Sequence, residues 1–281
     1  MLLALARVPE VQRLEALATR IETPCGAAGP MVWHRWGDGP PLVLLHGGSG
    51  SWTHWLRNID LLARKYTVYA ADLPGCGDSA LPAGARDADG IHEHVAAGIA
   101  QLTGAVPVEL VAFSFGTLVA GFIAATRPEL VKHLHLVGCA GLGLTRPTLN
   151  LRSLSGGAPA GHEAIVRANM ESLMVLHPAT LDDTALSLHY ANLKRDRLRR
   201  RRISRTQVMF ELQTRWQCPV HAIWGRGDVL IKHDSARLRE ALSGCDLREL
   251  TLVPDAGHWV QYERPEAFND VLLRAPWPPH G

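Results

Sequence analysis

A serine between an apolar run and an apolar helical segment is the clearest candidate for chemistry in this sequence. Ser114 directly follows residues 108–113 (VELVAF) and precedes a segment with helical spacing at 115–126. Two positions before and after it stand Ala112 and Gly116, which are small enough for a tight strand-to-helix turn. Such a turn projects a serine hydroxyl above a sheet, where it can act as a nucleophile. The alternative is a buried serine at a chance turn.

A histidine and an aspartate could supply the two partners that a nucleophilic serine needs. His258 follows a strand-like run at 247–253, and Asp228 follows the buried run 220–224. An imidazole can take the serine proton and later deliver it to the leaving group, while a carboxylate fixes the tautomer of the ring. We therefore predict Ser114 as nucleophile, Asp228 as orienting acid and His258 as general base, in a chain order known for hydrolytic triads.

Other acidic and histidine residues are weaker candidates. Asp255 and Glu263 are closer to His258 in sequence, but neither follows a separate buried strand, so we interpret both as loop or surface charges. The cluster His92-Glu93-His94 lacks the HExxH spacing, and residues two positions apart do not share a helix face. We expect no metal site and no cofactor.

A glycine-rich stretch, HGGSG at 46–50, follows a short apolar run. Glycines allow backbone N–H groups to point inward without interference from side chains. We expect the N–H of Gly48 or Ser49 to act with that of Phe115 as an oxyanion hole, which stabilises a tetrahedral intermediate. A phosphate-binding loop is the alternative, but GxGxxG and the Walker lysine are absent. We interpret His46 as an anchor of this loop.

The elements that would position these residues alternate between strands and helices. Apolar runs of strand length lie at 31–36 (an edge strand by pattern), 42–45, 67–72, 108–113, 133–137, 220–224 and 247–253. Helical spacing is found at 9–18, 91–102, 115–126, 234–243 and 265–273. This alternation predicts an α/β fold with a mostly parallel sheet and helices on both faces.

A long polar stretch interrupts the alternation. Residues 143–216 are mainly helical in pattern and separate two strand–helix units. We interpret them as a helical cap, or lid, inserted into an α/β core made of residues 1–142 and 217–281. The cap would lie over the carboxyl edge of the sheet, where open α/β sheets place their sites.

Composition indicates an ordinary globular enzyme. The 281 residues, 47% of them hydrophobic, suffice for one large α/β domain with a sizeable core. Five cysteines without a CxxC pair argue against a disulfide framework and for a reducing compartment, so we predict a cytoplasmic location. We expect no signal peptide and no membrane insertion, because no run of 18 apolar residues exists. A homodimer stays open as an oligomeric state.

The strongest charge cluster is KRDRLRRRRISR at 194–205, with eight basic residues and one acidic residue. Such a run can bind nucleic acid or an anionic membrane, but no nucleic-acid-binding signature surrounds it. The solvated face of a helix is the commoner explanation, and attraction of an anionic substrate or docking on an anionic surface or acyl-carrier protein are further alternatives. We expect a small-molecule substrate and no nucleic acid partner.

Five motifs in order resemble the α/β-hydrolase superfamily over nearly the whole chain: HGGSGSW at 46–52, DLPGCGDS at 72–79, AFSFG at 112–116, WGRGD at 224–228 and AGHWVQYERPEAFN at 256–269. The last motif, and GLGL at 141–144, are most similar to hydrolases that cleave carbon–carbon bonds in meta-cleavage products. In that family the histidine is followed by tryptophan, as His258-Trp259 is here. The resemblance implies a serine hydrolase.

Three positions depart from the meta-cleavage hydrolases. Their asparagine before the nucleophile is Phe113 here, and their asparagine near the oxyanion loop aligns with His54. Their cap arginine aligns with His189, with Arg195 and Arg197 as neighbouring alternatives. These losses of polar groups favour hydrolysis of a small to medium carboxylic ester or related carbonyl compound through an acyl-enzyme. Carbon–carbon cleavage is the alternative, and a non-catalytic ligand-binding protein of this fold is a third.

The expected substrate pocket is largely aromatic. Trp52, Phe113 and Trp259 would make it apolar, as ligand sites usually are, and His54 and His189 would add polar groups. Packing in the core is the competing explanation for each aromatic residue taken singly.

Overall fold

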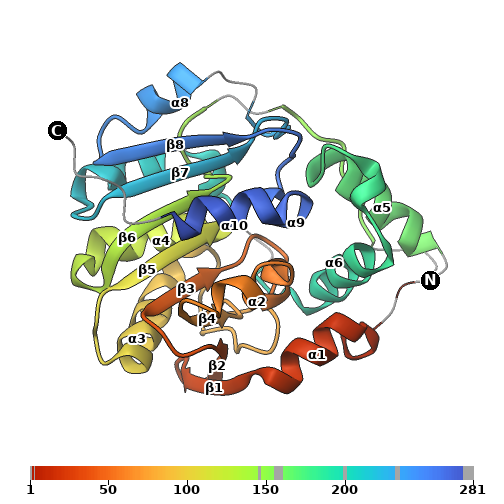
Figure 1. Ribbon diagram of the computed structural model, residues 1–281, viewed down its shortest axis with the longest axis horizontal. Helices are drawn as coiled ribbons and strands as arrows, with labels where there is room; N and C mark the ends of the chain where they lie inside the picture. The colour runs from red at the N-terminus through yellow and green to blue at the C-terminus, as the bar shows by residue number, and fades with distance from the viewer. Residues whose placement is uncertain are drawn as a thin grey trace.

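The computed structural model describes residues 2, 4–144, 147–154, 161–198, 201–231 and 235–274. Within these residues, eight strands form one sheet in the order β1-β2-β4-β3-β5-β6-β7-β8 (Figure 1). The strands span Thr19–Pro24 (β1), Pro30–Trp36 (β2), Pro41–Leu45 (β3), Thr67–Ala71 (β4), Val108–Phe113 (β5), Val131–Val137 (β6), Val220–Gly225 (β7) and Leu247–Val253 (β8). The strands from β3 to β8 are parallel, whereas β2 is antiparallel to both β1 and β4.

Helices cover both faces of the sheet. They span Pro9–Leu17 (α1), Ile59–Leu62 (α2), His92–Thr103 (α3), Phe115–Thr126 (α4), His162–Leu173 (α5), Asp183–Arg195 (α6), Val208–Leu212 (α7), Ser235–Ala241 (α8), Val260–Glu263 (α9) and Pro265–Leu273 (α10). One core packs α3, α4, α7 and α8 against the sheet, and a second packs α1, α2, α9 and α10 together with parts of α5 and α6. The predicted α/β fold, with a mostly parallel sheet between helical layers, is confirmed.

The sheet has one strand that the sequence patterns did not predict. β1 precedes β2 and pairs with it along its whole length. The interpretation of 31–36 as an edge strand is therefore wrong, because β2 lies between β1 and β4. β1 has the sequence TRIETP, and of its residues only Thr23 is buried, so it has no apolar run that would signal a strand.

Helices α5, α6 and α7 lie between β6 and β7 in the chain, within residues 143–216, which we call the inserted segment. In Figure 1, α5 and α6 lie at one side of the sheet, on the side of α9. Val166, Met170 and Leu186 bury their side chains in the core that α1, α2, α9 and α10 share. Packing against the sheet's helices thus holds this segment in place. No helix among the described residues is long and apolar enough to cross a membrane.

The basic run at 194–205 folds against the rest of the protein. Arg195 forms an ion pair with Asp78, and Arg197 donates a hydrogen bond to the carbonyl of Ser79. Arg201 pairs with a buried carboxylate, as described below. The interpretation of this run as the solvated face of a helix is wrong, because α6 ends at Arg195. Residues 199 and 200 of the run lie outside the described part of the chain.

Candidate active site

Ser114 occupies the tight turn between β5 and α4. Its backbone has φ 49° and ψ −111°, a conformation in which a non-glycine residue is strained. The turn is held because the Ser114 N–H donates to the Val137 carbonyl at 2.8 Å and Thr117 Oγ donates to the Ser114 carbonyl at 2.5 Å. A Cβ on Gly116 would lie 2.6 Å from the His46 carbonyl oxygen, so this position has no room for a side chain. The local sequence thus places a half-buried serine on the tight turn that the motif predicts.

His258 and Asp228 complete a continuous line of hydrogen bonds with Ser114. The His258 Nε2 atom lies 2.9 Å from Ser114 Oγ, and His258 Nδ1 lies 2.7 Å from Asp228 Oδ2. His258 and Asp228 are 3% and 4% exposed, so their hydrogen bonds are shielded from water. The other Asp228 oxygen accepts a hydrogen bond from the Leu230 N–H at 2.9 Å. This geometry allows the ring to receive a proton from the serine while its Nδ1–H stays bound to the carboxylate.

The loop after β3 presents free backbone donors beside this serine. The Gly47 N–H is used, since it donates to His54 Nδ1 at 3.3 Å. The N–H groups of Gly48, Ser49 and Phe115 find no hydrogen-bond acceptor among the described residues. A Cβ on Gly47 would lie 3.2 Å from Ser114 Cβ, so the loop passes close to the serine. The arrangement suits the binding of a negatively charged oxygen.

His46 anchors the start of this loop. Its Nε2 accepts a hydrogen bond from the Leu73 N–H at 2.9 Å, which leaves Nδ1–H to donate to the Gly47 carbonyl at 2.7 Å. The ring is fully buried, and burial lowers its pKa. The anchoring role that the sequence suggested for His46 matches these contacts.

Three of the expected pocket residues, His54, Phe113 and Trp259, lie near the triad, and His189 lies near His54. The Phe113 ring centroid lies 5.0 Å from that of His258 and 5.7 Å from that of His54. Trp259 donates a hydrogen bond from Nε1 to the His54 carbonyl at 3.2 Å. Burial lowers the pKa of His189 to about 4, and it lowers the pKa of His54 well below its usual value. Both imidazoles are therefore neutral at pH 7.

Trp52 packs elsewhere. Its ring lies 5.0 Å from His34 and 5.4 Å from Trp36, centroid to centroid, in the core against β2. These contacts favour core packing as the explanation for Trp52. The sequence could not distinguish the two roles, because an apolar site and an apolar core use the same residue types.

Glu263 has a role that the sequence did not reveal. It is 3% exposed and accepts hydrogen bonds from the backbone N–H groups of Leu176, His177 and Gly257. The interpretation of Glu263 as a loop or surface charge is wrong: it ties the inserted segment to the loop that carries His258. Asp255, by contrast, is exposed.

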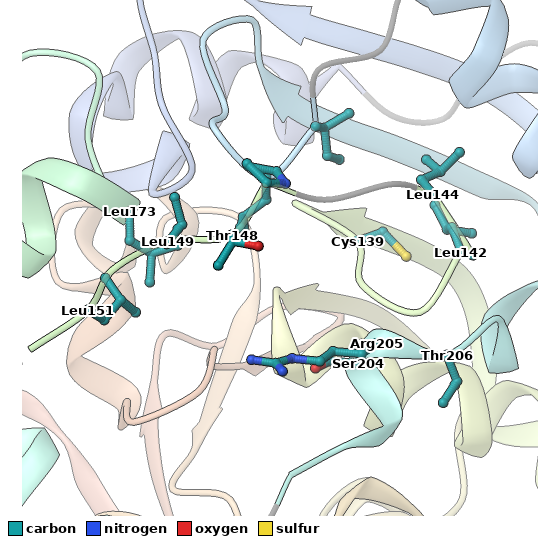
Figure 2. A pocket seen from close by; sticks show the side chains of 14 residues that line it. Cys139, Leu142, Leu144, Thr148, Leu149, Leu151, Leu173, Ser204, Arg205 and Thr206 are labelled. Carbon is teal, nitrogen blue, oxygen red and sulfur yellow. The ribbon is translucent and has the colours of Figure 1, made fainter. Parts of the chain in front are cut away.

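A cavity of about 450 Å³ reaches Leu230 and Ile231, in the loop after β7 that also carries Asp228 (Figure 2). Leucine is the commonest residue type in its wall, as Leu142, Leu144, Leu149, Leu151, Leu173 and Leu230. Arg205 is the charged residue that lines it. Leu230 is two residues beyond Asp228 in the chain, but Ser114, Asp228 and His258 do not line the cavity. No pattern in the sequence indicated that these leucines lie together, since they come from four separate segments.

Among the described residues, no group of three or more His, Cys, Asp or Glu side chains could hold a metal ion.

The family model described as "Alpha/beta hydrolase family" matches residues 42–271, which include every residue of this site. The chain belongs to the alpha/beta hydrolase family. It is an enzyme of this family, and its resemblance to the meta-cleavage hydrolases is confirmed by the relatives described next.

Two relatives illustrate the range of the family. One is the "dihydrolipoyllysine-residue acetyltransferase component of acetoin cleaving system" of Pseudomonas putida, 31% identical over 243 residues; the match covers 84% of this chain and 63% of that protein. The other is a "2-hydroxy-6-oxononadienedioate/2-hydroxy-6-oxononatrienedioate hydrolase" of a Pseudomonas species, 27% identical over 253 residues, covering 84% of this chain and 88% of that one. This chain thus spans less than two thirds of the first relative.

A solved structure shares the fold. The crystal structure of an esterase from Rhodococcus superposes with a TM-score of 0.72 at 22% identity, covering 90% of this chain and 97% of the esterase. At this level of identity the likeness shows the fold alone.

Proposed function

We propose that this α/β-hydrolase-family enzyme is a serine hydrolase that cleaves a small to medium carboxylic ester or related carbonyl compound. The observation that carries the proposal is the hydrogen-bonded line from Ser114 through His258 to Asp228. His258 would accept the Ser114 proton as the hydroxyl attacks the carbonyl carbon, and Asp228 would stabilise the imidazolium. The proton would then pass to the leaving group, giving an acyl-enzyme that a water activated by His258 hydrolyses.

The oxyanion of both tetrahedral intermediates would be held by backbone N–H groups. Phe115 would supply one donor and Gly48 or Ser49 the other, since their N–H groups have no acceptor among the described residues. Preorganised donors of this kind each contribute roughly 3–4 kcal/mol to the transition state. In this proposal the inserted segment acts as the cap that closes the site.

Three uncharged side chains, Phe113, His54 and His189, would favour a substrate that carries no charge where it contacts them. Phe113 is apolar, and His54 and His189 are buried and neutral at pH 7. A dienolate with a carboxylate would find no fixed positive charge among these three side chains. The leucine-lined cavity that reaches Leu230 would hold the apolar part of the acyl or alcohol group.

Carbon–carbon bond hydrolysis is the second candidate. The observation in its favour is the likeness to the 2-hydroxy-6-oxononadienedioate hydrolases, which covers 84% of this chain. The same triad geometry would serve that reaction.

The cysteines support the proposal of a cytoplasmic enzyme. None of the five is joined in a disulfide bond, and burial raises the pKa of the Cys25 thiol to about 11 and of the Cys218 thiol to about 12. Thiols with such raised pKa values are unreactive, which suits a packing role.

A substrate panel tests the proposal. It consists of p-nitrophenyl acetate, butyrate and octanoate beside one meta-cleavage product, with kcat/KM measured for each at pH 7. We expect the butyrate or octanoate ester to have the highest kcat/KM. A higher value for the meta-cleavage product would favour the second candidate, and no turnover of any of the four would contradict the ester proposal.

A matched variant tests the charge argument. His189→Arg would add a positive charge where wild type has a neutral ring, so it should raise the ratio of kcat/KM for a p-nitrophenyl ester with a terminal carboxylate to that for the butyrate ester by about tenfold, or ~1.4 kcal/mol. An unchanged ratio would show that His189 does not face the substrate.

A further inference from the structure

Residues 46–50, which we call the oxyanion loop after the role proposed for them, are joined to the inserted segment by the buried carboxylate of Asp196. Ser49 has a backbone φ of 50°, which costs free energy for a residue other than glycine. Its Oγ donates a hydrogen bond of 2.6 Å to Asp196 Oδ2, across 147 positions of sequence. Asp196 itself is only 5% exposed. The strained residue of the loop is therefore held by a side chain that belongs to another part of the chain.

Arg201 contacts both Asp196 and Ser49. Its Nη2 donates to Asp196 Oδ2 at 2.6 Å and to Ser49 Oγ at 3.2 Å. The guanidinium carbon lies 5.1 Å from the centroid of the Phe115 ring and 3.5 Å from the point where a Cβ on Gly48 would stand. The cation thus contacts the residues on both sides of the proposed oxyanion hole. Its charge balances the Asp196 carboxylate, which would otherwise be costly to bury.

Asp196 is fixed independently of the loop. Its second oxygen, Oδ1, accepts a hydrogen bond from the Leu198 N–H at 3.0 Å. The neighbouring Arg197 N–H donates to the Gly75 carbonyl at 2.8 Å, which ties this stretch to the loop after β4. Each Asp196 oxygen thus has a hydrogen-bond donor outside the oxyanion loop, namely the Leu198 N–H and Arg201. These contacts fix the carboxylate, so it can hold Ser49 in place.

We propose that Asp196 is a positioning residue for the oxyanion hole. It holds Ser49 in its strained conformation so that the free N–H groups of the loop face the reacting carbonyl. Arg201 binds the Asp196 carboxylate and keeps it in position. The inference rests on the proposed function, because it assumes that the loop binds an oxyanion. Donors in such a hole must be placed within about 0.5 Å of their productive position, so loss of a tether reduces catalysis without removing a donor. The hole is then complete only while the inserted segment is docked.

The rival explanation is that Asp196 merely fastens the inserted segment. Asp87 offers a matched control, because its carboxylate accepts hydrogen bonds from the Arg202 and Ile203 N–H groups of the same segment. Asp87 makes no hydrogen bond to residues 46–50. Asp87→Asn therefore weakens the attachment of the segment without touching the oxyanion loop.

The test compares catalysis with affinity for a tetrahedral analogue. In Asp196→Asn we expect kcat for p-nitrophenyl butyrate to fall by about ten- to a hundredfold, less than the 10²–10³-fold for deleting a donor, with KM little changed. The inhibition constant of butylboronic acid, which forms a tetrahedral adduct on serine, should rise by the same factor as kcat/KM falls. Asp87→Asn should leave both quantities unchanged.

Variants of Ser49 make the test specific. Ser49→Ala should reproduce the loss, and the double variant Ser49→Ala/Asp196→Asn should be no worse than either single variant, since both remove one contact. Ser49→Gly should tolerate Asp196→Asn better, because glycine adopts the φ of 50° at little cost. If Asp196→Asn fails to fold, the Ser49 variants decide alone.

Three results would overturn the inference: unchanged boronate affinity in the folded variants, an equal loss in Asp87→Asn, or additive losses in the double variant. Labelling of wild-type Ser114 by a fluorophosphonate separates this failure from failure of the proposed function. If wild type is neither labelled nor active, both the proposed function and the role of Asp196 are wrong.

Discussion

The two ring nitrogens of His258 have different partners, and their difference fixes the tautomer. Nδ1 lies 2.7 Å from an Asp228 oxygen, which can only accept, so Nδ1 carries the hydrogen and Nε2 is left to accept from Ser114 Oγ at 2.9 Å. Asp228 therefore acts on the serine through the histidine. Its removal should affect proton transfer more than substrate binding.

Asp228→Asn tests this assignment. An asparagine amide can donate to Nδ1 and so stabilise the wrong tautomer, which should lower kcat by about 10⁴-fold with little change in KM. The measurement is steady-state hydrolysis of p-nitrophenyl butyrate. Asp255→Asn is the control, because Asp255 is exposed and close in sequence to His258. A loss below tenfold in Asp228→Asn would mean that another group orients the ring.

At the scale of elements, the site depends on the close approach of β3 and α4. A Cβ on Gly116 would lie 2.6 Å from the carbonyl oxygen of His46 and 2.7 Å from that of Leu45, and backbone atoms cannot move aside as a flexible side chain can. The spacing between the oxyanion loop and the serine turn is set by this contact.

Gly116→Ala should therefore lower both stability and activity. We expect a loss of about 1–3 kcal/mol in the free energy of unfolding, as for other overpacked sites, and a fall in kcat because the Phe115 N–H shifts. Chemical denaturation and esterase assays measure the two effects. Gly161→Ala is the matched control, since nothing lies within 4 Å of a Cβ there. Equal stability of both variants would contradict the packing argument.

Sequence patterns located the elements that have strong local signals. β5 and α4 were predicted with their observed limits, because a continuous apolar run, a serine and a helical run each leave a distinct pattern. β1 was missed because it is largely exposed and has no apolar run. Glu263 and Asp196 were missed for another reason: Glu263 binds Leu176 and Asp196 binds Ser49, each more than 80 residues away in the chain, and no local pattern encodes such contacts.

The residues of the site likewise include some that local sequence patterns predicted and some that they did not. Ser114, Asp228 and His258 were found from their places after strands, which the parallel topology brings to one edge of the sheet. The six leucines of the cavity were not, because a leucine has the same local sequence pattern whether it faces a cavity or a core. Trp52 shows the same ambiguity for an aromatic residue, since its ring packs against His34 and Trp36.

At the scale of the whole molecule, buried neutral histidines make stability depend on pH. Burial lowers the pKa of His34 to about 4, against a usual value of 6.5. Between these values the unfolded chain binds a proton that the folded protein does not, so stability is fully present above pH 6.5 and is lost as the pH falls toward 4. His189, whose pKa is also about 4, acts in the same direction.

His34→Phe should lower the number of protons taken up on unfolding by one, while it keeps a ring against Trp36 and Trp52. Near pH 5 the slope of unfolding free energy against pH should fall by about 1.4 kcal/mol per pH unit. Urea denaturation at half-unit intervals from pH 4.5 to 7.5 gives both slopes. Parallel curves for wild type and variant would show that His34 is protonated in the folded protein.

The central claim is that Ser114 is a nucleophile activated by His258, and covalent labelling tests it most directly. The protein is incubated with a fluorophosphonate probe, and its intact mass is followed by mass spectrometry in wild type and Ser114→Ala. The account predicts that wild type gains the mass of one probe and that peptide mapping places it on Ser114, while Ser114→Ala gains none. An unlabelled wild type, or equal labelling of Ser114→Ala, would contradict it.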